Sequence, residues 1–177
     1  MLDSGDKVQA FDPANASLND ENAVVISVDQ VTPYLDAALK ALGLHIEART
    51  SFITYVYSVS CIHCLNISKI TRYWLPFLLE HKYIAFRFLP QASYEQAAPL
   101  EVSPIPDIVT RIFMIFKGVE ESELEVWPAA RKRVNVDVSA WIDIVGVDVR
   151  RTVDKGLFRV IEWGGMEVAC SGAQLEL

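Results

Sequence analysis

The sequence predicts an α+β fold in which N-terminal helices pack on a mostly antiparallel β-sheet. The chain of 177 residues is 51% apolar, which is enough material for one buried core. Its clearest helical pattern lies early, where Leu35, Leu39 and Leu42 fall on one face. Short runs rich in β-branched and aromatic residues follow, and such runs are typical of strands.

Five segments have strand character. In "KYIAFRFLP", Ile84, Phe86 and Phe88 share one face and Arg87 lies on the other. The run "DIVTRIFMIFKG" is apolar on both faces, which is typical of a central strand covered on both sides. The predicted strands span residues 23–28, 83–90, 107–117, 141–149 and 157–163.

Cap residues set the expected bounds of the first helix. Thr32 is a favourable N-cap, Pro33 suits the first helical position, and Gly43 fits just past the end. A second, shorter helix is expected from Ile46 to Thr50.

We expect one domain, covering residues 23–170. Residues 1–22 have the composition of turns and are predicted to form a weakly ordered lead-in. Residues 119–140 are polar and charged and are expected to lie outside the core. Residues 171–177 form a short tail.

Charge and composition argue against several partners. A net charge of −7 gives no electrostatic attraction to nucleic acid. No run approaches the ~18 to 20 apolar residues of a bilayer span, and the polar N-terminus lacks the pattern of a signal peptide. We therefore expect a cytoplasmic protein with no nucleic-acid or membrane partner.

The stretch Cys-Ile-His-Cys at residues 61–64 is a candidate redox motif. A Cys-x-x-Cys between a strand and a helix is the arrangement of thiol–disulfide oxidoreductases, because the helix N-terminus lowers the pKa of the first thiol. Cys61 would be the nucleophile and Cys64 the resolving thiol of a thioredoxin-like enzyme. The required strand would cover residues 51–60.

Other residues oppose this redox interpretation. Ser60 stands where an aromatic residue is expected, and Pro76 would interrupt the following helix. A zinc site is also disfavoured, because His45, His81 and Cys170 show no paired spacing that would complete it. The sequence therefore predicts no metal and no cofactor.

Several short motifs follow one another along the chain in a specific order and spacing. They are Leu42-Gly43-Leu44, Tyr94 with Ala98, Leu100 and Val102, Pro104 with Pro106 and Asp107, Arg111-Ile112-Phe113-Met114, and Phe158 through Gly165. In this pattern, over residues 28–119 and 157–168, the chain resembles a family of uncharacterised proteins from bacteria with fungal relatives. The resemblance implies no reaction, cofactor or ligand.

One motif of that family is interrupted here. The family's unbroken F-I-x-Y-W-L-P is divided by residues 55–72 into an F-I-T half and a Y-W-L-P half. The codons at the two junctions can contain a fungal 5′ splice signal and a 3′ AG, and the 18 intervening codons make 54 nucleotides, in frame. We therefore expect residues 55–72 to derive from a retained intron, whose removal would take Cys61 and Cys64 with it.

The "EWGG" motif is the most distinctive remaining candidate for a binding site. Glu162 and Trp163 could line a ligand pocket beside a turn at Gly164 and Gly165, where the backbone can approach a partner. A strand end with a packed Trp and a turn is the structural alternative.

Two arginines lie within apolar strands. Arg111 is a candidate binding residue together with Glu162 and Trp163. Both Arg111 and Arg87 are also expected to pair with carboxylates, and such pairs are more often structural than catalytic. The candidate partners are Asp107, Glu101 and Glu162. No combination of residues converges on a reaction, so the sequence favours a non-enzymatic binding or interaction domain, with the thioredoxin-like oxidoreductase as the alternative.

Overall fold

A computed structural model describes residues 8–55 and 80–168 of the chain. Both Cys61 and Cys64, most of the segment 55–72, and the predicted tail 171–177 lie outside the described residues.

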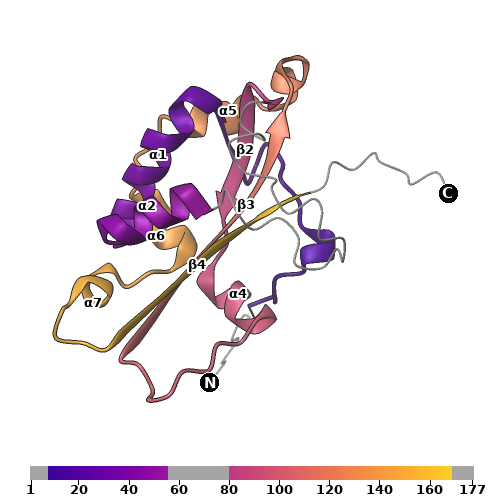
Figure 1. Cartoon of the computed structure of the whole chain (residues 1–177). Coiled ribbons are helices and arrows are strands. Elements are labelled where there is room, and N and C mark those ends of the chain that lie inside the picture. Colours follow the sequence, from indigo (N-terminus) through magenta and orange to yellow (C-terminus); the bar gives the residue numbers. More distant parts are fainter. Residues whose placement is uncertain (1–7, 56–79, 169–177) are drawn as a thin grey trace, which may run out of the picture.

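The described strands form a four-stranded sheet in the order β1-β2-β3-β4 (Figure 1). The first three strands pair antiparallel, and β4 runs parallel to β3. The predicted α+β class with a mostly antiparallel sheet is therefore confirmed. The strands are β1 (Val24–Ser27), β2 (Tyr83–Phe88), β3 (Ile108–Val119) and β4 (Arg159–Glu167).

The helices lie on both faces of the sheet. Figure 1 shows α1, α2 and α6 together on one side. The helices are α1 (Val28–Ala41), α2 (Ile46–Tyr55), α4 (Gln91–Ala97), α5 (Pro128–Arg133), α6 (Ala140–Val145) and α7 (Val149–Val153). Two short 3-10 helices are η1 (Pro13–Asn15) and η3 (Glu121–Val126).

Each face of the sheet has its own apolar cluster. Alternate residues of β2, such as Phe86 and Phe88, pack under α1, α2 and α6. Ala85 and Leu89 face the other way and pack with Leu124 and Trp127. Strand β3 contributes to both clusters, as expected for a central strand.

Helix α1 begins earlier than the cap residues predict. Ser27 is the N-cap, so Thr32 and Pro33 lie inside the helix. The early start places Val31 one turn before Leu35 on the buried face. Its C-terminal end agrees with the prediction, because Gly43 adopts a φ of 86° just after the helix.

The predicted strand over residues 141–149 is wrong, since α6 and the start of α7 occupy this segment. Trp141 and Val145 are four residues apart and both buried, which is helical spacing. Gly146, with a φ of 79°, ends α6 after only six residues. A helix this short leaves too little periodic sequence to be distinguished from a strand.

The central part of residues 119–140 belongs to the core, contrary to the prediction. Leu124, Trp127 and Ala130 are buried at intervals of three residues, which aligns them on one side of η3 and α5. Asp20 accepts hydrogen bonds from the N–H groups of Ala129 and Ala130, at 2.8 and 2.7 Å. Polar residues around these three apolar positions conceal the pattern in the sequence.

The N-terminal segment is also more ordered than predicted over residues 8–22. The Phe11 N–H donates to the Ser93 carbonyl at 3.0 Å, and its ring lies 6.2 Å from the Phe113 ring. Leu18 is buried in the cluster beneath this segment. These long-range contacts order the segment, although its composition is typical of turns.

Candidate functional site

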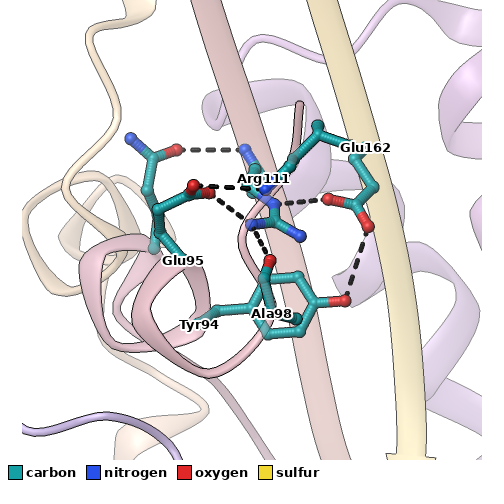
Figure 2. Close-up of polar contacts among 7 residues, drawn as sticks. Tyr94, Glu95, Ala98, Arg111 and Glu162 are labelled. Atoms are coloured by element: carbon teal, nitrogen blue, oxygen red, sulfur yellow. Dashed lines mark hydrogen bonds and ion pairs between the residues drawn. The ribbon is translucent and has the colours of Figure 1, made fainter. Parts of the chain in front are cut away.

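Arg111 on β3 is almost fully buried, with 3% of its side chain exposed. Its Nε donates to Glu162, the directly opposite residue on β4, and its Nη1 donates to Glu95 on α4 (Figure 2). Of the three predicted partners, the structure supplies Glu162. Glu95 was not a predicted partner, because only the packing of α4 on β3 brings it to the arginine.

Tyr94 completes this arginine cluster. Its ring lies against the Arg111 guanidinium (Figure 2), whose central carbon is 4.3 Å from the ring centroid. The same ring stacks on Phe113 at 4.6 Å between ring centroids. Burial and the nearby Glu162 carboxylate raise the pKa of the Tyr94 hydroxyl. Burial opposes the charge on Arg111, but its hydrogen bonds with both carboxylates raise the pKa of the guanidinium. The cluster thus holds α4, β3 and β4 together as an internally paired unit.

Trp163 does not share a site with Glu162. Consecutive strand residues point to opposite faces, and Trp163 packs with Phe52 of α2 at 5.8 Å between ring centroids. The predicted glycine turn is also wrong, because Gly164 and Gly165 continue β4. At Gly164 an added Cβ would lie 3.3 Å from the Phe113 ring, so a close approach accounts for this glycine.

The other candidate site is a cavity of about 270 Å³ that sequence reasoning missed, and we call it the Trp141 cavity. Its walls include the aromatic side chains of Tyr34, Phe88 and Trp141, which come from α1, β2 and α6. The Trp141 Nε1–H donates to the Tyr34 hydroxyl at 3.1 Å, which fixes both rings. Val136 and Ile144 also line it, although both are largely solvent-exposed.

Two cations interrupt these apolar walls. Arg87 lies near the end of β2, and Arg133 is the last residue of α5. Burial lowers the pKa of the Arg87 guanidinium, and its buried Nε has no hydrogen-bond partner in the described part of the chain. Arg133 instead donates to the carbonyls of Asp20 and Ala23, at 2.7 and 2.6 Å.

Arg87 also borders a second hollow, of about 280 Å³, on the side of the N-terminal segment. Leu89 and Phe11 line this second hollow, and Pro90 borders both hollows. Arg87 therefore does not make the predicted carboxylate pair. It lies between two hollows, near the edge of the sheet where β1 begins opposite Phe86.

The redox and metal candidates are placed as follows. Residues 51–55, predicted as part of the strand before the Cys-x-x-Cys, are helical in α2. His45 contacts Glu47 at 2.9 Å and His81 contacts Glu120 at 3.1 Å, at separate places. In residues 8–55 and 80–168, no group of three or more His, Cys, Asp or Glu side chains is placed to hold a metal ion.

Fold and site together define an α+β protein with an aromatic, arginine-bearing cavity between its helices and its sheet. Comparison with protein-family models, curated proteins and solved structures gave no match. Among the helices that the structure describes, none is long and apolar enough to cross a membrane.

Proposed function

We propose that this chain is a non-enzymatic binding domain and that a small organic molecule occupies the Trp141 cavity. The observation that carries this proposal is the Arg87 guanidinium, which has no hydrogen-bond or ion-pair partner among the described residues and lies at the wall of a partly aromatic cavity. A ligand that accepts a charge-assisted hydrogen bond from this unpaired guanidinium gains affinity. Apolar walls with few polar groups are the usual composition of small-molecule sites.

The chemistry of the cavity wall favours binding over catalysis. Its titratable groups are Tyr34, two arginines, Glu21 and Asp137. Burial raises the pKa of the Tyr34 hydroxyl, so this group stays protonated at neutral pH and does not act as a general base. The Asp137 carboxylate accepts the Ser139 N–H at 2.7 Å, so its hydrogen-bonding capacity is partly used at the start of α6.

The proposal is tested with N-phenyl-1-naphthylamine, an uncharged probe that fluoresces in apolar sites. We expect saturable binding to the full chain. Ala140→Trp should weaken it by about tenfold or more, because Ala140 lines the cavity and a large side chain there would fill it. Ala97→Trp is the matched control, since Ala97 is an exposed alanine on α4.

Equal binding by the wild-type chain and Ala140→Trp would place the probe elsewhere and contradict the proposal. A linear, unsaturable rise in fluorescence would do the same. Circular dichroism of both variants verifies that the fold is retained.

The sequence motif at residues 61–64 supports one other function, a thioredoxin-like thiol–disulfide oxidoreductase. Its distinguishing property is reduction of insulin disulfides in the presence of dithiothreitol, lost in Cys61→Ser. The helical state of residues 51–55 removes half of the strand that this interpretation requires, so we rank it second.

We also propose that residues 55–72 derive from a retained fungal intron. Helix α2 runs through the F-I-T half of the divided motif, as expected if that half belongs to the folded domain. If the segment is absent from the mature protein, Cys61 and Cys64 are absent with it, and only the binding function is left.

A further inference from the structure

The charge of the Trp141 cavity indicates what kind of molecule it accepts. The chain as a whole carries a net charge of −7, yet its two cavity arginines form no ion pair in the described part of the chain. By contrast, Arg49 and Arg111 pair with Asp36 and with two glutamates, respectively. Both guanidinium groups at this cavity therefore lack a direct carboxylate partner among the described residues.

The acidic residues of the cavity wall do not pair directly with the two arginines. Glu21 and Asp137 line the cavity, but neither carboxylate lies within 4.0 Å of a guanidinium nitrogen of Arg87 or Arg133. Asp137 is directed instead to the Ser139 N–H. An anionic group on the ligand would be the first carboxylate-like partner for Arg87.

The N–H donors of the two cavity arginines suit a ligand with a single negative charge. The Nη1 of Arg133 already donates to two backbone carbonyls, which leaves the Arg87 guanidinium as the less committed group. One planar guanidinium matches one carboxylate, whereas a phosphate dianion in an apolar cavity needs more donors to offset its loss of hydration. A cavity of about 270 Å³ holds a molecule smaller than most drug-sized ligands, which occupy about 300–1,000 Å³.

We infer that the ligand class of the Trp141 cavity is a small organic carboxylate, with its acid group paired to Arg87 and an aromatic or branched aliphatic body along Trp141 and Phe88. This inference rests on the proposed binding function. Exposed Val136 and Ile144 extend the apolar wall toward solvent, where the body of such a molecule would cover them.

The test measures displacement of N-phenyl-1-naphthylamine by two molecules of the same shape, 4-phenylbutyrate and the uncharged 4-phenylbutyramide. We expect the acid to compete at least about tenfold better in the full chain, because a charge-assisted hydrogen bond is stronger than a neutral one. In Arg87→Met the acid should lose this advantage, and in Arg87→Lys it should keep part of it, because the charge is retained without the planar fork. Arg150→Met, which removes an exposed arginine of α7, should leave the ratio unchanged.

The outcomes separate the inference from the function on which it rests. If the uncharged probe does not bind, the binding function fails. If the probe binds but acid and amide compete equally, the function stands and the carboxylate class is overturned. Stronger competition by 2-phenylethyl phosphate than by 4-phenylbutyrate would also overturn it, in favour of a phosphate ester. Because the ratio of acid to amide is measured within each variant, a change in probe affinity does not affect the comparison.

Discussion

At the residue scale, Arg111 and Arg87 show two different fates of an arginine in an apolar strand. Arg111 is surrounded by two carboxylates, a carbonyl and an aromatic ring, so its burial is compensated within the fold. Arg87 has no such partner in the described part of the chain and borders two hollows. The first arrangement is that of a structural ion pair, and the second leaves an interaction open for a ligand.

The structural role of Arg111 gives a stability prediction. Arg111→Met should lower the free energy of unfolding by about 2–3 kcal/mol, because it removes three hydrogen bonds made by a charged group. Glu162→Gln should cost less, and Glu95→Gln least, since the Glu95 side chain is 47% exposed against 34% for Glu162. Urea unfolding monitored by circular dichroism measures all three. A loss below about 0.5 kcal/mol in Arg111→Met would contradict the structural role, because changes that small are typical of surface sites.

At the element scale, the end of α1 depends on Gly43. The Leu44 N–H donates to the Leu39 carbonyl and the Gly43 N–H to the Lys40 carbonyl, both at 3.0 Å, which is the Schellman arrangement. An added Cβ at Gly43 would lie 3.1 Å from Thr152, whose hydroxyl is hydrogen-bonded to the buried Thr110 at 2.7 Å. This turn therefore fixes α1 against α7 as well as ending the helix.

Gly146 offers a matched comparison for this turn. It also has a positive φ, but an added Cβ there meets nothing within 4 Å. Gly146→Ala should cost about 1 kcal/mol for the backbone conformation alone. Gly43→Ala should cost more, about 2 kcal/mol, because Thr152 must also move. Equal losses in urea unfolding would show that the contact with Thr152 contributes nothing.

The elements that sequence reasoning predicts well are those with long periodic patterns. Strands β2 and β3 and the C-terminal end of α1 agree with prediction because alternation and a capping glycine are local properties. Helix α6 was predicted as a strand because its buried pair, Trp141 and Val145, gives a single helical repeat. The prediction that η3 and α5 lie outside the core is wrong for the same reason, since three buried positions among charged residues give only weak helical periodicity.

At the scale of the whole molecule, the Trp141 cavity has no local signature at all. Its lining comes from the start of β1 and the residues just before it, from α1 and β2, and from α5, α6 and the turn between them, which are far apart in the sequence. Arg87 was recognisable as a charge in an apolar strand, but its lack of a carboxylate partner follows only from tertiary packing. Glu162 and Trp163, adjacent in the sequence, are separated by the alternation of β4. A site assembled in this way becomes visible only after the fold is known.

The intron proposal also belongs to this scale, and it predicts that the fold does not need residues 55–72. The described residues alone supply an apolar cluster on each face of the sheet, joined by the continuous register of β1, β2 and β3. In a chain where Thr54 is followed directly by Tyr73, the connection between α2 and β2 falls to about a third of its length. Closing a chain segment of this shorter length costs less entropy, by about 1 kcal/mol.

We therefore expect the shortened chain to unfold cooperatively in urea, with a midpoint equal to or above that of the full chain. It should also bind N-phenyl-1-naphthylamine with unchanged affinity, because the residues that form the Trp141 cavity are all retained. Amplification of the transcript across codons 45–90 provides the independent check, and a product shorter by the 54 nucleotides of 18 codons is expected. Loss of cooperative unfolding, together with a transcript of full length only, would make residues 55–72 part of the native fold. Cys61 and Cys64 would then be genuine residues of the protein, and the oxidoreductase would become the leading hypothesis.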